Sequence, residues 1–248
     1  MSPTVIVYGV VCIFLAAIVR GYSGFGFSLL AVTALSLVLP PSVIVPSIFM
    51  LEIAASLHLL PSIWKDIHWR SLGPLTLGCL AATPVGVYFL ANVPAAPMQV
   101  AIAGFVLAAT LLMWQGYALK SMPGPVASTA AGAAAGLANG AFGMAGPPVI
   151  VFYFASPAGD IAGRASLIAF FIATDTIGLA FLWREGLITL EAATRALTFL
   201  PPLVAGVWLG ARTFRGTDPA IFRRWVLMIL ASLAVLTAIL GISRLELP

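Results

Sequence analysis

The stretch Arg20–Ser28, RGYSGFGFS, interrupts an apolar run with a cation, three glycines and two serines. Two chemistries use such a stretch. Gly21-Tyr22-Ser23-Gly24 matches the G-x-S-G pattern around the serine nucleophile of an intramembrane protease. Alternatively, a glycine break between helices leaves backbone N–H groups free to hold an anion, and helix N-termini add partial positive charge.

A second break, NGAFGMAGPP at Asn139–Pro148, favours the anion chemistry. It offers N–H groups, a side-chain amide and prolines suited to starting a helix. The alternative is that these glycines only allow close helix packing, as we expect for Gly132 and Gly136. The predicted anion ligands are the N–H groups of Gly24–Phe27 and Gly140–Gly143, together with the polar side chains beside them. The full predicted binding set is Arg20, Ser23, Gly24, Phe25, Gly26, Phe27, Ser28, Asn139, Gly140, Ala141, Phe142 and Gly143, with Phe25 and Phe142 as walls of the site.

Two carboxyls stand in the middle of apolar runs, Glu52 and Asp175. A charged, unpaired carboxylate at mid-bilayer costs about 2.5–3.5 kcal/mol, so a functional role is the default hypothesis. We predict that both take up protons and couple anion transport to proton movement. The alternative is a structural carboxyl that is hydrogen-bonded to Ser56, Thr174 or Thr176. His58 is predicted to lie on the helix face opposite Glu52 and to have no role in the site.

The composition identifies the setting of these residues. The chain has 248 residues, of which 61% are apolar and 8% charged, with a mean hydropathy of +1.10. A soluble domain carries about 25% charged residues, so the chain is predicted to be an integral membrane protein. No stretch is polar enough for a soluble or nucleic-acid-binding domain. Cys12 and Cys79 lie in apolar runs without metal-ligand spacing, so no metal or cofactor is expected.

Hydropathy and helix-breaking residues divide the chain into ten apolar segments. Four are shorter than the roughly 20 residues that cross a bilayer, and they form two consecutive pairs, broken or re-entrant. The fold class is therefore an all-α polytopic membrane protein. The predicted segments are 4–19, 25–39, 43–63, 71–91, 97–117, 126–139, 143–156, 165–183, 193–213 and 222–243, of which the first, second, sixth and seventh are short.

The two halves of the chain resemble each other in order and spacing, which predicts an internal repeat. Residues 1–120 form the first copy and residues 121–248 the second, within one compact membrane domain. Since each copy has an odd number of segments, the second is inverted relative to the first. The matched positions are Phe25-Gly26-Phe27 with Phe142-Gly143-Met144, Pro40 with Pro157, Glu52 with Asp175, and Gly86-Val87-Tyr88 with Gly206-Val207-Trp208.

The distribution of basic residues predicts the orientation, because Lys and Arg gather on the cytoplasmic side. With both termini outside, nine basic residues are cytoplasmic and three are external. The nine are Arg20, Lys65, Arg70, Lys120, Arg164, Arg212, Arg215, Arg223 and Arg224, and the three are Arg184, Arg195 and Arg244.

The repeat decides between the two chemistries. A protease would need a histidine in contact with Ser23, and the second half has no matching serine or histidine. Paired broken helices in inverted repeats are the usual way in which secondary transporters build a site near the midplane. We therefore interpret the chain as a transporter and not as an enzyme, with the protease as a remote alternative.

The sequence resembles the TauE/SafE family of sulfite and organosulfonate exporters. The resemblance rests on GYSGFGFSLLAV, on GLANGAFGMAGPPVIVFYF, and on PMQVAIAGFVLAATLLMW with its counterpart PAIFRRWVLMILASLAVLT. It covers nearly the whole chain. Family members carry a more glycine-rich first break, where this chain has Tyr, Ser and Phe. The resemblance implies a multi-helix carrier that moves small sulfur-containing or carboxylate-like anions across the cytoplasmic membrane, usually outward.

The combined interpretation is a secondary transporter of a small oxyanion, such as sulfite or an organosulfonate, working as an exporter coupled to protons. The alternative is an anion channel with the same architecture. The expected partners are the anionic substrate, protons and the lipid bilayer, without nucleic acid. The sequence leaves a homodimer open.

Overall fold

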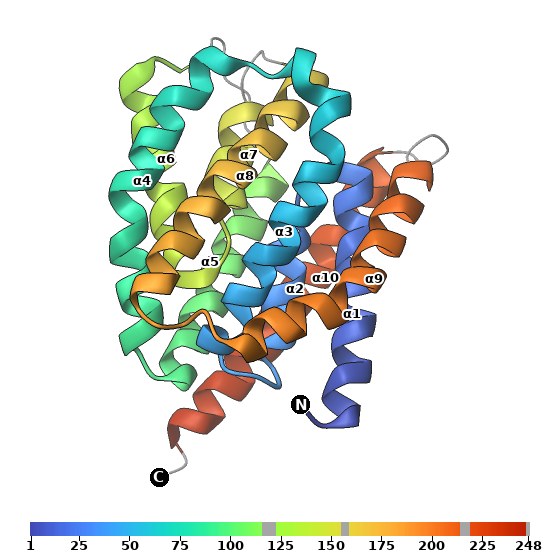
Figure 1. Cartoon of the computed structure of the whole chain (residues 1–248), viewed down its shortest axis with the longest axis vertical. Helices are drawn as coiled ribbons and strands as arrows, with labels where there is room; N and C mark the ends of the chain where they lie inside the picture. The colour runs from blue at the N-terminus through green and yellow to red at the C-terminus, as the bar shows by residue number, and fades with distance from the viewer. Residues whose placement is uncertain (116–122, 155–158, 214–218, 247–248) are drawn as a thin grey trace.

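A computed structural model describes residues 1–115, 123–154, 159–213 and 219–246. The regular secondary structure of this part of the chain is all helical, and the order of the helices is visible in Figure 1. The helices are α1 (Pro3–Ser23), α2 (Phe27–Leu35), α3 (Pro41–Ile63), the 3-10 helix η1 (Trp64–Asp66), α4 (Trp69–Asn92), α5 (Ala95–Gln115), α6 (Pro125–Phe142), α7 (Gly146–Phe154), α8 (Gly159–Arg184), α9 (Leu190–Thr213) and α10 (Pro219–Glu246).

Seven of the described helices are long and apolar enough to cross a membrane, namely α1, α3, α4, α5, α8, α9 and α10. This confirms the prediction of an all-α polytopic membrane protein. Large apolar side chains such as Leu77, Leu111 and Leu197 are more than 60% exposed, as lipid-facing residues of a membrane protein are.

The prediction of four short segments is only partly right. The helices α2 and α7 have nine residues each, and the whole of α2 is buried. However, α1 has 21 residues instead of ending near residue 19, and α6 has 18 residues and ends at Phe142. The helix α1 continues through Gly21 because the backbone of α9 packs there: a Cβ at Gly21 would lie 2.2 Å from the Val207 carbonyl oxygen.

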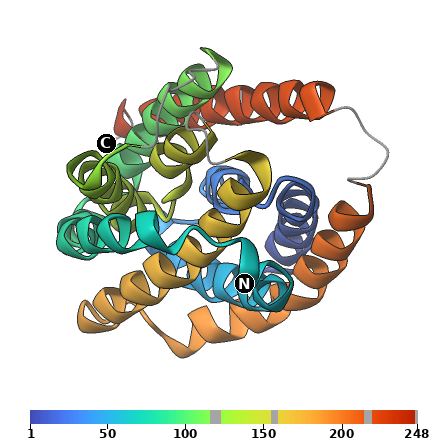
Figure 2. The same cartoon turned by 90° about the horizontal axis from the view of Figure 1, so that it is seen from above.

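The helices pack in four main pairs: α1 with α9, α4 with α6, α3 with α8, and α5 with α10. Viewed from above, α2 lies near the centre, with α9 and α10 along the outer edge (Figure 2). Glycines bring the first two pairs into backbone contact. A Cβ at Gly210 of α9 would lie 2.1 Å from the Ile18 carbonyl oxygen, and one at Gly132 of α6 would lie 2.0 Å from that of Leu75. Small residues at membrane helix crossings permit this close approach.

The start of α1 and the end of α10 lie at the same end of the molecule (Figure 1). The link between α8 and α9 lies at that end as well, whereas η1 and the start of α4 lie at the opposite end. This arrangement agrees with the predicted grouping of Arg184 and Arg244 away from Lys65 and Arg70. The assignment of the termini to the outside of the cell stays a prediction.

The close crossing of α4 and α6 predicts a specific sensitivity to one methyl group. Gly132→Ala should lower the free energy of unfolding by about 1–3 kcal/mol, because a backbone oxygen cannot move aside as a flexible side chain can. The control is Gly104→Ala in α5, where a new Cβ has nothing within 4 Å. That substitution should be neutral or raise stability by up to about 1 kcal/mol through helix propensity. Thermal unfolding of both variants in detergent measures the difference, and equal melting temperatures would contradict the packing described.

Candidate functional site

The first bend lies between α1 and α2 and is built around two glycines with left-handed backbone. Gly24 has φ +81° and Gly26 has φ +88°, a conformation that side chains rarely adopt. The Ser23 hydroxyl lies 2.7 Å from the Val19 carbonyl oxygen and 2.8 Å from that of Phe25, and it accepts the Phe25 N–H at 3.3 Å. The Gly24 N–H donates to the Arg20 carbonyl oxygen at 2.7 Å. Ser23 therefore stabilises the bend itself.

These bonds correct part of the predicted set of anion ligands. The N–H groups of Gly24 and Phe25 are already used within the bend, so they are not free donors. The N–H groups at the start of α2 are different, since the first turn of any helix lacks intrahelical acceptors. In α2 that turn begins at Phe27 after the N-cap Gly26, and it includes Ser28.

The second bend lies between α6 and α7, further along the chain than predicted. Asn139, Gly140, Ala141 and Phe142 belong to α6, so the N–H groups of Gly140–Phe142 are internal to a helix and not exposed by a break. The bend itself starts at Gly143, which has φ +70° and donates its N–H to the Asn139 carbonyl oxygen at 2.7 Å. The helix extends because Gly140 packs against α4, where a Cβ would lie 2.4 Å from the Thr83 carbonyl oxygen.

The second bend lies beside the helix that follows the first bend. A Cβ at Gly146, the first residue of α7, would lie 4.0 Å from the Leu29 Cδ1 atom in the first turn of α2. One at Gly143 would lie 3.6 Å from the Val32 Cγ2 atom, also in α2. Segments more than 110 residues apart thus meet around α2. Phe25 and Phe142 are half-buried, and the Phe142 ring packs against Phe105 with centroids 5.2 Å apart.

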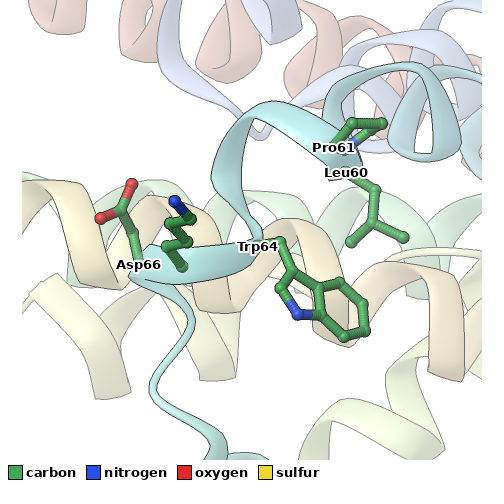
Figure 3. A pocket seen from close by; sticks show the side chains of 5 residues that line it. Leu60, Pro61, Trp64 and Asp66 are labelled. Carbon is green, nitrogen blue, oxygen red and sulfur yellow. The ribbon is translucent and has the colours of Figure 1, made fainter.

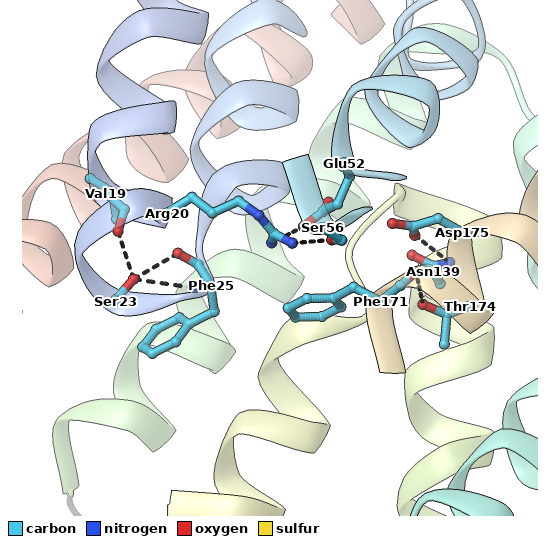
Figure 4. A network of polar contacts seen from close by, with 10 residues as sticks. All are labelled: Val19, Arg20, Ser23, Phe25, Glu52, Ser56, Asn139, Phe171, Thr174 and Asp175. Carbon is cyan, nitrogen blue, oxygen red and sulfur yellow. Dashed lines mark hydrogen bonds and ion pairs between the residues drawn. The ribbon is translucent and has the colours of Figure 1, made fainter. Parts of the chain in front are cut away.

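Arg20 is a fully buried ion-pair partner instead of a free cation beside the bend. Its side chain has 0% exposure, and its Nη1 atom donates to Glu52 Oε1 at 2.5 Å. Its Nη2 atom donates to the Ser56 hydroxyl, and its Cζ atom lies 5.2 Å from the centroid of the Phe171 ring. Figure 4 shows the guanidinium between α1 and α3. The positive charge that Arg20 was predicted to add beside the first bend is therefore paired with Glu52 in this conformation.

Asp175 has a different type of partner. It is 1% exposed, and its Oδ1 atom accepts the Asn139 side-chain N–H at 3.2 Å. Its Oδ2 atom is buried and has no hydrogen-bond partner among the described residues. The alternative partners predicted for the carboxyls are occupied elsewhere: Thr174 donates to the Phe171 carbonyl oxygen, and Thr176 donates to that of Ile172.

These side chains form one group, here called the central polar cluster: Arg20, Glu52, Ser56, Asn139 and Asp175 (Figure 4). The charges of Glu52 and Arg20 both act on Asp175, and the Ser28 hydroxyl interacts with Glu52. The cluster joins four helices, α1, α3, α6 and α8, and Ser28 links it to the first turn of α2. Both sequence-predicted carboxyls therefore belong to one buried network next to the bends.

Arg164 of α8 is a residue that the sequence did not place in the site. Its side chain lies against Gly24, where a Cβ would be 2.7 Å from the Arg164 Cγ atom, and its Nη2 atom donates to the Gly21 carbonyl oxygen at 3.1 Å. A cation at the C-terminal end of α1 complements the helix dipole. In the sequence Arg164 is 143 residues away from Gly21, and only its basic character could suggest a link to the bend.

A surface pocket of about 690 Å³ lies at the end of α3 and in η1 (Figure 3). It is lined by Leu60, Pro61, Trp64, Lys65 and Asp66, and none of the predicted site residues contributes to it. Lys65 and Asp66 bring opposite charges to it, so it does not have the character of an anion site. His58, near this end of α3, is exposed, whereas Glu52 on the same helix is buried.

The family model described as sulfite exporter TauE/SafE matches residues 9–237. The chain belongs to the TauE/SafE family. A relative from Cupriavidus necator, named probable sulfite/organosulfonate exporter TauE, is 26% identical over 211 residues, which cover 81% of this chain and 80% of the relative. No solved structure matches the chain. TauE/SafE proteins are transporters, so this chain is a multi-pass membrane transporter and not a protease, and its Gly21-Tyr22-Ser23-Gly24 motif serves the bend.

The buried ion pair predicts a large effect on stability. Glu52→Gln should lower the free energy of unfolding by about 3–5 kcal/mol, because it leaves the Arg20 charge buried without a counter-ion. Arg20→Met combined with Glu52→Met should recover most of this loss, since it removes both charges.

Thermal unfolding in detergent measures these effects, with Glu191→Gln as the control at an exposed position. If the double variant were less stable than Glu52→Gln, the charges would not be coupled as described.

Proposed function

We propose that the chain exports a small oxyanion, sulfite or an organosulfonate, and couples this export to proton movement through the central polar cluster. The observation that carries the proposal is the position of this cluster: two buried carboxyls and a buried guanidinium lie at the crossing of four helices, beside two glycine bends. Ionisable groups deep in a membrane protein mark substrate and proton pathways. The name of the Cupriavidus necator relative supports the class of substrate.

The proposal includes two inverted copies, residues 1–120 and 121–248. If α1–α5 correspond in order to α6–α10, a two-fold axis turns the α1–α9 contact into the α6–α4 contact. The same axis maps the α3–α8 contact onto itself and the α5–α10 contact onto itself, because each contact joins two equivalent helices. These are the four observed main pairs, and α2 and α7 have equal length. Inverted repeats of this kind suit alternating access around a central site.

The anion ligands in this proposal lie mainly at the first turn of α2. Its N–H groups, from Phe27 onward, carry the positive end of the helix dipole, and Ser28 adds a hydroxyl near Glu52. Arg164 lies against the preceding bend and adds positive charge there, whereas the charge of Arg20 is paired with Glu52. In the second half Asn139 and the bend at Gly143 face the same interior region. Phe25 and Phe142, both half-buried, form the walls.

The proposal predicts coupled flux in proteoliposomes that contain the purified full-length chain and labelled sulfite under anoxic conditions. An imposed pH gradient should drive sulfite above its equilibrium distribution at a clamped voltage, and a protonophore should abolish this accumulation. Flux that follows only the electrochemical gradient of sulfite would indicate an anion channel instead. The same vesicles with taurine, isethionate or sulfoacetate define which class of oxyanion is moved.

A second prediction concerns Ser23. Ser23→Ala should weaken sulfite binding about twofold to tenfold, since it removes the local hydrogen bonds that shape the bend and no direct ligand of the anion. Calorimetry on the purified protein measures this change, and Ser243→Ala, exposed at the end of α10, should leave it unaltered. Complete loss of binding in Ser23→Ala would mean that the hydroxyl itself contacts the anion.

A further inference from the structure

The two carboxyls of the central polar cluster occupy matched helices but have partners of different charge. Glu52 of α3 receives a full positive charge from Arg20 of α1. Asp175 of α8 receives only a neutral amide N–H from Asn139 of α6. In each half, a residue of the first helix thus donates to a carboxyl of the third, but only the first half supplies a cation.

The observed hydrogen bonds favour one distribution of charge in the cluster. Arg20 and Glu52 cancel each other, and both Nη atoms of Arg20 are engaged, one by Glu52 and the other by Ser56. No cation among the described residues hydrogen-bonds to Asp175. An uncompensated carboxylate at this depth is unfavourable by several kcal/mol, about 2.5–3.5 by insertion scales. A proton on Asp175 removes that charge, and the Oδ2 atom, which has no described partner, is the position where it fits.

The described residues around Asp175 supply no other counter-charge. The charged groups that act on it electrostatically are Glu52 on α3 and Arg20 on α1, and Asp175 in turn acts on the Cys79 thiol on α4. The hydroxyl of Tyr153, on the neighbouring helix α7, hydrogen-bonds to Ser71 of α4. Arg164 lies three turns away on α8 itself, against Gly24. Glu52 opposes ionisation of Asp175 by like-charge repulsion, while Arg20 is already paired.

We propose that Asp175 alone carries the coupled proton, whereas Glu52 stays ionised as the permanent partner of Arg20. The inference rests on the proposed function, because it assigns the proton step of that transporter to one of its two carboxyls. The step is a simple exchange: protonated Asp175 releases H⁺ to water and becomes a carboxylate, and the reverse restores it. Asn139 holds Oδ1 in both states and leaves Oδ2 to the proton.

This assignment also predicts whether binding of the proton favours or opposes binding of the anion. With Asp175 protonated the cluster is neutral, so an oxyanion near the first turn of α2 meets no net negative charge. Loss of the proton adds a negative charge and repels the anion. The proton and the anion therefore bind together and move in the same direction. A coupling between two sites typically changes affinity about 5–150-fold, and a change of this size is expected for sulfite between protonated and deprotonated Asp175.

Infrared spectroscopy on the purified full-length protein tests where the proton lies, without any substrate. A protonated carboxylic acid has a C=O stretching band that a carboxylate lacks. At neutral pH the wild type should show this band, Asp175→Asn should lose it, and Glu191→Gln, an exposed control, should keep it. A band that persists in Asp175→Asn and disappears in Glu52→Gln would place the proton on Glu52 and overturn the proposal.

Transport measurements give an independent readout. In wild-type proteoliposomes with an internal pH dye, a sulfite gradient should move protons in the direction of sulfite. Asp175→Asn should still exchange labelled for unlabelled sulfite, but without proton movement, and its sulfite affinity should not vary with pH. Proton movement that survives in Asp175→Asn would overturn the inference. Absence of sulfite flux in the wild type would instead overturn the proposed substrate, and the infrared bands would still decide the protonation of Asp175.

Discussion

The arrangement of the interior depends on one requirement: the charge of Arg20 has no access to water and must be neutralised within the protein. Glu52 meets this requirement at 2.5 Å, and it can do so only if α1 remains helical through residue 20 and turns that face toward α3. The bend therefore begins after Ser23. The short helix α2 then starts beside the carboxyl, with Ser28 next to Glu52. The ion pair thus requires α1 to be helical through residue 20, and the left-handed Gly24 and Gly26 then end α1 and begin α2.

The outer helices hold this interior in place through backbone contact more than through side-chain interlocking. The glycines of α1 and α9, and those of α4 and α6, remove the side chains that would keep the helices apart. Lipid provides little hydrophobic drive for helix association, so tight van der Waals packing of this type supplies much of the stability. The bends can then remain irregular, because protein buries most of their backbone.

Sequence reasoning located the features that depend on composition and depth. The ten segments, the buried carboxyls Glu52 and Asp175, and the left-handed glycines Gly26 and Gly143 all follow from breaks in long apolar runs. It failed where helix rotation matters. A helix that is apolar on every face has no sequence pattern that shows which way a given residue points. The contact of Arg20 with Glu52, 32 residues away, could therefore not be predicted. Gly21 and Gly140 were likewise taken as breaks, although each is a packing contact inside a helix.

The unequal partners of the two carboxyls have an energetic consequence for the proposed carrier of two inverted copies. If the two copies had the same residues, the conformations open to either side of the membrane would be related by the two-fold axis and would have equal free energy. An arginine in one copy and an asparagine in the other remove this degeneracy, because the bonds of one copy then differ from those of the other. An empty carrier of this design has a preferred resting orientation, and the substrate must supply the energy that moves it away.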